Sequence, residues 1–237
     1  MSDSTEHLLA WGGEKVACTV WEPAGGPARR RTAVVMHGAG AADQSVHGQL
    51  VRQLAERGCR TLAFDFTGHG ASSGLLQELS LSDRFDQARA VIDSLAPGED
   101  HLVLVGASMS GQTVADLAAH YGGRVAAVGL LAPAVYPRRA WPLRFDSGFT
   151  QAIRVPQAWR DSAALDTYAH YTGRAVLAVP GRDHVIPPAV NEALVQALSV
   201  RADFTHLVFP DADHHLGRYF QANPDACARF ADALTAP

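Results

Sequence analysis

The chain has 237 residues, of which 47 % are hydrophobic and 19 % charged, a composition that suits one large single-core domain and excludes wholesale disorder. Its net charge of −4, without a basic stripe, argues against a nucleic-acid partner. No stretch approaches the ~20 apolar residues of a membrane span, and the polar, acidic start lacks the pattern of a secretory signal. Three scattered cysteines, Cys18, Cys59 and Cys227, form no metal-binding spacing and predict reduced thiols in a cytoplasmic protein.

Taken in chain order, short apolar runs alternate with amphipathic segments. Residues 7–21 predict an antiparallel strand pair that turns at Gly12 and Gly13, and the Pro- and Gly-containing residues 22–31 predict a surface loop. Further strands are expected at residues 32–36, 61–64, 102–105, 125–131, 175–179 and 205–209, and helices at 46–54, 81–95, 109–121, 190–198 and 219–234. Because continuous apolar strands are typical of sheets buried on both faces, the pattern predicts a doubly wound, mostly parallel α/β sheet.

Residues 133–173 interrupt this alternation, since two expected strands are separated there by far more than the usual few residues. The stretch contains seven aromatic residues: Tyr136, Trp141, Phe145, Phe149, Trp159, Tyr168 and Tyr171. They predict either a helical excursion with its own small core or a lid whose underside lines a substrate pocket, and both can hold. Five arginines in the stretch are better explained as solvated surface residues than as contacts for an anionic substrate. We therefore expect a single domain, residues 1–237, with a cap insertion over 133–173.

The run LVLVGASMSG, residues 102–111, predicts a strand that ends in a sharp turn and is followed by a helix. This is the setting of a nucleophile elbow, with Ser108 at the turn. The backbone angles at such a serine are strained, and the residues two before and two after it nearly touch, so both must be small, as Gly106 and Ser110 are. The turn exposes the hydroxyl above the positive end of the helix. Ser110 is a rival nucleophile, and a serine that only caps the helix is the structural alternative.

An acid and a base are expected further along the chain. A serine hydroxyl attacks poorly unless a base takes its proton and a third group holds that base in one tautomer. Asp183 follows the expected strand 175–179, at the sheet edge where active-site groups collect in open α/β folds, although it could serve only to stabilise a turn. His214 and His215 follow the next expected strand at the same edge. A metal site around these histidines is disfavoured, because helically spaced histidines or a third spaced ligand are lacking.

A glycine-rich turn follows the strand at residues 32–36, with the sequence His37-Gly38-Ala39-Gly40. Such a turn can direct a backbone N–H group at developing negative charge, and the N–H of Met109 would supply a second donor. His37 itself is expected to hold the loop rather than to react.

Five ordered segments resemble the signature of the α/β-hydrolase family. They are His37-Gly38-x-Gly40, residues 65–74 (DFTGHGASSG), residues 106–111 (GASMSG), Gly181-Arg182-Asp183 with Ile186-Pro187, and Asp213-His214. The resemblance covers about residues 15–234 and is strongest to small esterases that cleave cinnamoyl, feruloyl or other short acyl esters. It departs from the family at two positions, since Ala107 stands where many relatives carry histidine and Ser110 where they carry glycine.

The resemblance implies an α/β-hydrolase fold with Ser108, Asp183 and His214 as the catalytic triad. It implies Ala39 and Met109 as oxyanion donors, favours His214 over His215, and gives the 65–74 loop, with His69, a structural role.

The expected reaction is hydrolysis of a small-molecule carboxylic ester through an acyl-enzyme, with no metal or organic cofactor and no membrane or nucleic-acid partner. A thioesterase, an acyltransferase or a C–C hydrolase would use the same triad, and the sequence does not separate them. A non-catalytic binding protein of this fold would be expected to lack a triad member, and none is missing.

Overall fold

The computed structural model describes residues 4–23, 31–96, 98 and 101–236, so most of the expected loop at 22–31 lies outside the described residues. Within them the chain forms an eight-stranded sheet in the order β1-β2-β4-β3-β5-β6-β7-β8. The strands are β1 (Ser4–Trp11), β2 (Glu14–Trp21), β3 (Arg31–Met36), β4 (Arg60–Phe64), β5 (His101–Ala107), β6 (Val125–Leu131), β7 (Arg174–Arg182) and β8 (Asp203–Asp213). In this described sheet β2 runs antiparallel to both of its neighbours, and the remaining adjacent strands are parallel. The doubly wound, mostly parallel sheet predicted from the sequence is confirmed.

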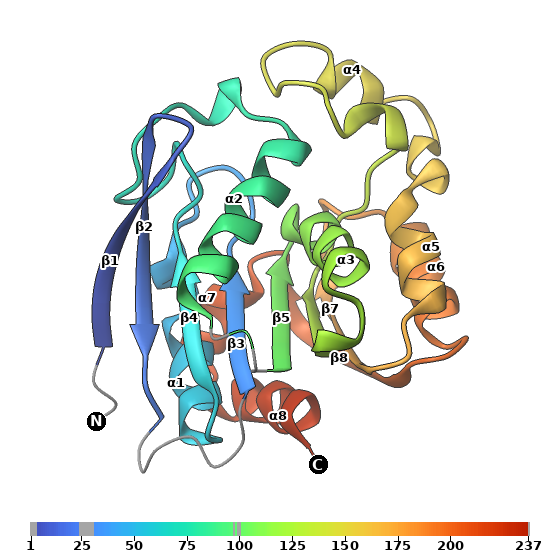
Figure 1. The fold of residues 1–237 in the computed structure, drawn as a ribbon. Coiled ribbons are helices and arrows are strands. Elements are labelled where there is room, and N and C mark those ends of the chain that lie inside the picture. The colour runs from blue at the N-terminus through green and yellow to red at the C-terminus, as the bar shows by residue number, and fades with distance from the viewer. Residues whose placement is uncertain (1–3, 24–30, 97, 99–100, 237) are drawn as a thin grey trace.

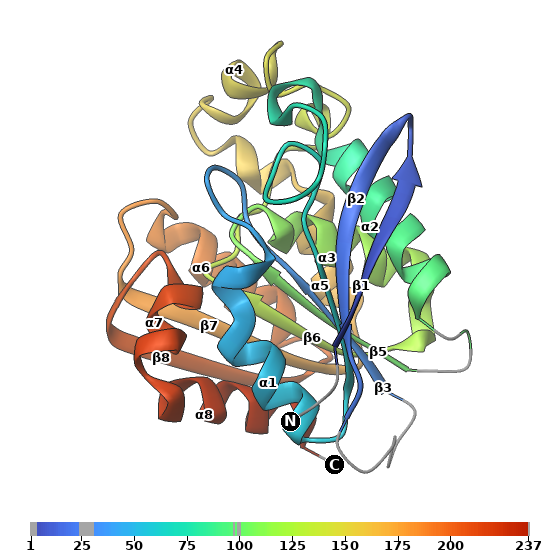
Figure 2. The same ribbon diagram turned by 90° about the vertical axis from the view of Figure 1, so that its left-hand side faces the viewer.

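Helices cover both faces of the sheet (Figures 1 and 2). One face is covered by α1 (Gly48–Glu56), α7 (Leu216–Ala222) and α8 (Pro224–Thr235). The other is covered by α2 (Leu81–Leu95), α3 (Ser110–Tyr121), α5 (Ala163–His170) and α6 (Pro188–Leu198). Each central strand therefore contributes to two cores.

The alternation of side chains along β3 illustrates the two cores. Val34 and Met36 pack with residues of α2 and α3, whereas Ala33 and Val35 pack with residues of α1 and α8. All four side chains are buried, which removes apolar surface from water on both sides of the sheet at ~25 cal/mol per Å². Cys18, Cys59 and Cys227 are buried in these cores as free thiols.

Two expectations about the C-terminal part of the chain are wrong. Strand β8 lies at the edge of the sheet, and of its residues Phe209 and Ala212 alone are buried, so it is not covered on both faces. The helix expected over residues 219–234 is two helices, because Pro224 cannot continue a helix that precedes it but suits the first position of a new one.

The segment after β6 crosses above the carboxyl ends of the strands before it returns to the sheet as α5 (Figure 1). Its short helix α4 (Phe149–Ile153) contributes Phe149 and Ala152 to a separate apolar cluster with Leu81 and Met109. This cluster packs the segment against the start of α2 and the turn after β5. Helix α5 instead packs beside α3 and α6, and the hydroxyl of its Tyr168 donates a hydrogen bond to the carbonyl of Gly111 at 2.6 Å.

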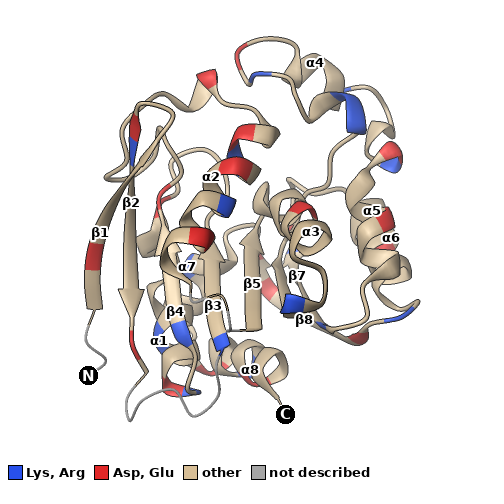
Figure 3. Ribbon diagram, viewed as in Figure 1, with Lys and Arg blue, Asp and Glu red and all other residues tan. Residues whose placement is uncertain are grey.

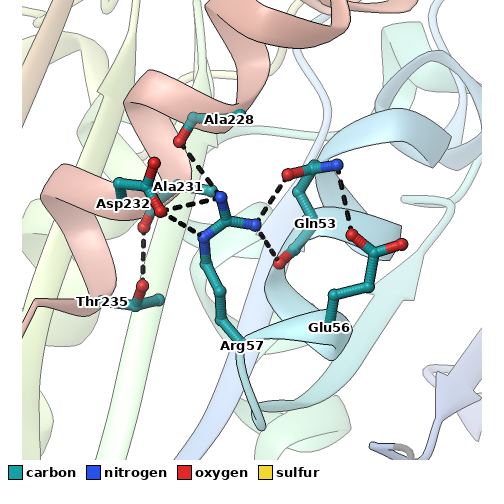
Figure 4. A network of polar contacts seen from close by, with 7 residues as sticks. All are labelled: Gln53, Glu56, Arg57, Ala228, Ala231, Asp232 and Thr235. Atoms are coloured by element: carbon teal, nitrogen blue, oxygen red, sulfur yellow. Dashed lines mark hydrogen bonds and ion pairs between the residues drawn. The ribbon is translucent and has the colours of Figure 1, made fainter.

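Helices α1 and α8, far apart in the sequence, are joined by the Arg57 side chain (Figure 4). Its Nε donates to Asp232 Oδ1 at 2.8 Å, and its Nη1 donates to the Gln53 carbonyl at 2.8 Å. Because the Asp232 side chain is 69 % exposed, water screens this ion pair, and the apolar contacts beneath it supply most of the stabilisation.

Charged residues of both signs are distributed over the outer helices, and acidic and basic residues alternate along α2 (Figure 3). On that helix Arg89 forms ion pairs with Asp86 at 3.3 Å and Asp93 at 3.8 Å. No helix within the described residues has the length and apolar character needed to cross a bilayer.

Candidate active site

Ser108 occupies the sharp turn between β5 and α3, as the sequence predicts. Its φ angle of 49° lies in the left-handed region that a residue with a side chain rarely adopts. A hydrogen bond from its N–H to the carbonyl of Leu131 at 2.9 Å holds it there, and its own carbonyl accepts from Gly111 and Ala134. A Cβ on Gly106 would overlap the Ser110 carbonyl and lie 2.7 Å from Val114 Cγ2, so only glycine fits two residues before the serine.

Three of the predicted side chains form one hydrogen-bonded chain. His214 Nε2 lies 3.0 Å from Ser108 Oγ, and His214 Nδ1 lies 3.0 Å from Asp183 Oδ2. The Asp183 side chain is 4 % exposed and that of His214 is 12 % exposed. With Asp183 as acceptor, Nδ1 of a neutral His214 carries the proton, so Nε2 is left free to accept the serine proton.

The carboxyl ends of β7 and β8 bring the acid and the histidine together. These strands remain paired up to Arg182 and Asp213, and a Cβ on Gly181 would lie 2.7 Å from the Pro210 Cα. Asp183 also forms the turn considered as its alternative role, because its Oδ1 accepts from the N–H groups of Val185 at 2.7 Å and Ile186 at 3.0 Å. One carboxylate oxygen therefore shapes the turn while the other faces the histidine.

The two rival residues lie in different surroundings. Ser110 is fully buried, and its hydroxyl donates to the His37 carbonyl at 2.6 Å, so it is not accessible to a substrate. His215 is exposed, with its ring centroid 5.6 Å from that of His214, and its N–H donates to Asp213.

The described acidic residues near these histidines do not form a metal site. Asp211 is paired with Arg182 at 2.9 Å. Among the described residues, no group of three or more His, Cys, Asp or Glu side chains is arranged to hold a metal ion.

The loop after β3 passes directly beside Ser108. A Cβ on Gly38 would lie only 3.1 Å from Ser108 Cβ, so the absence of a side chain there permits the close approach. In the described part of the chain, neither the N–H of Ala39 nor that of Met109 has a hydrogen-bond partner. Ala39 lines the cavity that contains Ser108, and Met109 follows the serine directly.

The imidazole of His37 supports this loop. It is buried, its Nε2 accepts from the N–H of Phe66 at 3.1 Å, and its ring centroid lies 4.6 Å from that of His69. Burial, more than the neighbouring Arg84, holds the pKa of His37 well below its ordinary value, so this histidine is a neutral structural group at physiological pH. In the 65–74 loop, Asp65 accepts a hydrogen bond from the Gln44 N–H at 2.7 Å, which links the two loops.

Two cavities meet at Ser108. One, of about 260 Å³, is bounded by residues 38–42 of the glycine-rich loop, by His214 and by the start of α7. The other, of about 300 Å³, is lined by apolar side chains that include Tyr136, Ile153, Trp159 and Ile186. Of the seven aromatic residues in 133–173, Tyr136 and Trp159 therefore line this cavity.

Two of the five arginines in the 133–173 segment pair with nearby acids. Arg138 pairs with Asp161 at 3.5 Å and also with Asp166, and Arg144 pairs with Asp146 at 2.9 Å. These exposed pairs support the interpretation of the arginines as surface residues.

Two buried residues near the site were not predicted from the sequence. His47 lines the smaller cavity, neither of its ring nitrogens has a partner among the described residues, and burial lowers its pKa to about 4. Arg84 is completely buried on the inner face of α2. The signal for Arg84 is its helical spacing, because it lies three residues after Leu81 and four before Ala88, inside the apolar stripe.

Comparisons with known proteins agree with this architecture. Similar solved structures include Est1E from Butyrivibrio proteoclasticus with bound ferulic acid, at 20 % identity and a TM-score of 0.75 over 98 % of this chain and 100 % of that one. They also include a CIB-like hydrolase from Thermoplasma acidophilum, at 17 % identity and a TM-score of 0.70 over all of both chains. A thioesterase domain from the curacin biosynthetic pathway is 18 % identical, with a TM-score of 0.69 over 97 % of this chain and 98 % of that one.

At these identities the structural likeness shows the fold alone, and no curated protein matches the chain significantly. A family model described as serine aminopeptidase, S33, matches residues 27–164, which is more than half of the chain. The protein therefore belongs to the S33 serine aminopeptidase family and is a hydrolase of the α/β-hydrolase fold.

Proposed function

We propose that this protein is a serine esterase that cleaves a small carboxylic ester through an acyl-enzyme on Ser108. The observation that carries the proposal is the hydrogen-bonded chain from Ser108 Oγ through His214 to Asp183, with both contacts to the imidazole at 3.0 Å. A nucleophile, a base and an orienting acid within hydrogen-bonding reach are the groups that acyl transfer requires.

In the first half-reaction, Ser108 Oγ attacks the ester carbonyl while its proton passes to His214 Nε2. The carbonyl oxygen becomes an oxyanion, and we assign its binding to the N–H groups of Ala39 and Met109, which have no partner among the described residues. The carboxylate of Asp183 stabilises the imidazolium and holds its orientation. When the tetrahedral intermediate collapses, the bond to the leaving oxygen breaks and His214 returns the proton to that oxygen, which releases the alcohol.

In the second half-reaction, water attacks the acyl carbon and gives one proton to His214 Nε2. Collapse of the second intermediate breaks the bond to Ser108 Oγ, which takes the proton back from the imidazole. The acid leaves, and the enzyme regains its starting state. Each step uses groups of this chain and water.

The shape of the site suits an ester, and its charge disfavours a cationic substrate. An ester extends from its carbonyl carbon in two directions, as an acyl group and an alcohol group. Two cavities, of about 260 and 300 Å³, meet at Ser108 and could each hold one of these groups. We propose that the cap segment forms the apolar wall of the larger cavity through Tyr136 and Trp159. An aminopeptidase must bind a substrate ammonium group, but no Asp or Glu is among the described residues that line either cavity. A thioester remains a second candidate, since the curacin thioesterase domain shares the fold and the same donors would serve its carbonyl.

Covalent labelling provides the first test. A fluorophosphonate probe should modify the wild-type protein with 1:1 stoichiometry, and Ser108→Ala should abolish both labelling and turnover of p-nitrophenyl butyrate. The matched control is Ser94→Ala, because Ser94 is exposed on α2, away from the described cavities, and this change should alter neither property. Labelling that persists in Ser108→Ala would contradict the proposal.

The bond cleaved is tested with an ester and a thioester of one neutral acyl group and with an arylamide whose acyl group carries a free amine. An ester, a thioester and an aminoacyl arylamide should be compared by kcat/KM with the same preparation. We expect the ester to be turned over at least ~10-fold faster than the arylamide, because the lining provides no carboxylate for an ammonium group. Preference for the arylamide would replace the esterase assignment with that of an aminopeptidase.

A further inference from the structure

Arg84 is a buried cation without a carboxylate partner. Its side chain is completely buried, its guanidinium lies 3.6 Å from the centre of the Phe66 ring, and no ion pair is formed by it among the described residues. Its Nε and Nη1 atoms have no hydrogen-bond partner there either. Burying an unpaired charge is strongly unfavourable, so a cation kept against Ser110 of the nucleophile elbow calls for a functional explanation.

The guanidinium forms hydrogen bonds with residues of two different backbone segments. Arg84 Nη2 donates to the carbonyl of His37 at 2.9 Å and lies 2.9 Å from Ser110 Oγ. The Ser110 hydroxyl in turn donates to the same His37 carbonyl at 2.6 Å. Arg84, Ser110 and the His37 carbonyl thus form a closed triangle of hydrogen bonds, which we name the Arg84 clamp.

The clamp joins the two backbone segments that carry the proposed oxyanion donors. His37 precedes Gly38 and Ala39 in the glycine-rich loop, and Ser110 follows Met109 in the elbow. No hydrogen bond between main-chain atoms connects residues 37–40 to residues 108–110 within the described chain, so the side chains of Arg84 and Ser110 are the polar link between them. This link also accounts for serine at the position where many relatives carry glycine, because glycine would have no hydroxyl to complete the triangle.

We propose that Arg84 is a positioning residue that, through Ser110 and the His37 carbonyl, holds the N–H groups of Ala39 and Met109 at the spacing needed to bind the oxyanion. This inference rests on the proposed esterase function. It predicts that loss of the clamp weakens binding of the transition state while leaving binding of the ground-state ester almost unchanged, since negative charge develops on the carbonyl oxygen only as the ester approaches the tetrahedral intermediate.

Three variants test the clamp. Arg84→Met removes the charge but fills the space of the stem, Ser110→Gly removes the bridging hydroxyl, and Arg84→Lys keeps a cation that can reach one acceptor. Arg84→Met and Ser110→Gly should each lower kcat by about 10- to 100-fold with KM within about 2-fold of wild type, since small misplacements at a catalytic centre cost up to ~100-fold. Arg84→Lys should restore part of the loss.

A second measurement separates positioning from mere structural support. Phenylboronic acid adds to a catalytic serine as a tetrahedral anion, so its inhibition constant should rise in parallel with the loss of kcat/KM. The matched control is Gln87→Met on the same helix. Gln87 is also buried, but it bonds to Thr67 through a donor at 2.9 Å and an acceptor at 2.8 Å and does not touch the clamp. It should lose stability yet keep the wild-type kcat and boronate affinity.

The outcomes distinguish this inference from the proposed function. If the wild-type protein neither labels with fluorophosphonate nor turns over an ester, the proposed function fails. If it does both, and folded Arg84→Met or Ser110→Gly keeps the wild-type kcat and boronate affinity, the clamp has no positioning role. An equal kcat loss in Gln87→Met would likewise overturn the inference.

Discussion

The two carboxylate oxygens of Asp183 have different hydrogen-bond partners. Replacing one oxygen by an NH2 group, as in Asp183→Asn, tests whether they have different roles. Oδ1 accepts two N–H groups of its own turn, and Oδ2 faces His214 Nδ1. In Asp183→Asn the amide oxygen can keep the turn, which leaves the NH2 group facing the histidine. His214 Nδ1 must then accept, so its proton moves to Nε2, which can no longer act as the base toward Ser108.

We therefore expect Asp183→Asn to lower kcat by about 10³- to 10⁴-fold while the free energy of unfolding changes by less than about 1 kcal/mol. The measurements are steady-state kinetics on p-nitrophenyl butyrate and urea unfolding. Asp211→Asn serves as the control, because Asp211 lies on the same edge of the sheet in an exposed ion pair with Arg182. A fully active Asp183→Asn would mean that the residue only shapes its turn.

Single residues also mark the limit of what the sequence can predict. The small residues around Ser108 are dictated by local geometry, so the elbow could be recognised from ten consecutive letters. Arg84 and Gln87 could not be assigned in this way, because a polar residue in an apolar stripe is buried only when distant partners satisfy it. Those partners, the His37 carbonyl and Thr67, lie 47 and 20 residues away.

Among the elements, the centres of strands were predictable and their ends were not. Apolar runs locate the middle of β7 and of β8, but the two strands continue to Arg182 and Asp213 because each supplies the hydrogen-bond partner of the other. The buried face of α2 also differs from the simple apolar pattern. Phe85 has the helical spacing of Leu81, Ala88 and Ile92 yet is only partly buried, whereas Arg84 and Gln87 are buried. Hydrophobic periodicity therefore fixes the orientation of a helix only to within about one residue.

The segment at residues 133–173 provides a prediction at the scale of one element. Trp159 lines the cavity of about 300 Å³ beside Ser108, so Trp159→Ala should weaken contacts with an aromatic acyl or alcohol group but not with a methyl group. An aromatic contact is worth about 0.5–1.5 kcal/mol, which corresponds to roughly a 2- to 12-fold change. The ratio of kcat/KM for a cinnamoyl ester to that for the matching acetate should fall by this factor.

The control for this experiment is Trp141→Ala in the same segment. Trp141 lines a different cavity, and its Nε1 donates to Asp116 Oδ2 at 3.0 Å. This variant should lose stability but keep the substrate ratio. Equal losses on both esters in Trp159→Ala would indicate that Trp159 supports the fold of the 133–173 segment rather than the selection of substrate.

At the scale of the whole molecule, the candidate site depends on the topology of the sheet. Ser108, Asp183 and His214 follow β5, β7 and β8, and these strands run parallel, so their carboxyl ends meet at one edge. This is why the order of motifs along the chain predicted which residues would meet. The same packing buries titratable groups, and it therefore links the stability of the whole molecule to pH.

Two kinds of buried group act on that stability in opposite directions. Burial lowers the pKa of His37 and brings that of His47 to about 4, so the unfolded chain binds protons at these sites below about pH 6.5 that the folded chain does not bind. Burial raises the pKa of Asp116 to about 6, so between about pH 6 and 4 the folded chain holds a proton that the unfolded chain has lost. With His69, whose pKa is also lowered by burial, three imidazoles outweigh one carboxyl group, and the free energy of unfolding should fall as the pH is lowered through this window.

The contribution of one buried histidine to this pH dependence can be measured at His47. Each proton bound only by the unfolded chain contributes a slope of about 1.4 kcal/mol per pH unit. His47→Leu removes one such proton, so its free energy of unfolding, measured in urea from pH 6.5 to 4, should decline less steeply than that of wild type by about this amount, whatever its absolute stability. His101→Leu is the matched control, because His101 is exposed at the start of β5 and its substitution should leave the slope unchanged. An unaltered slope in His47→Leu would show that His47 takes up its proton equally in both states, as a histidine open to water would.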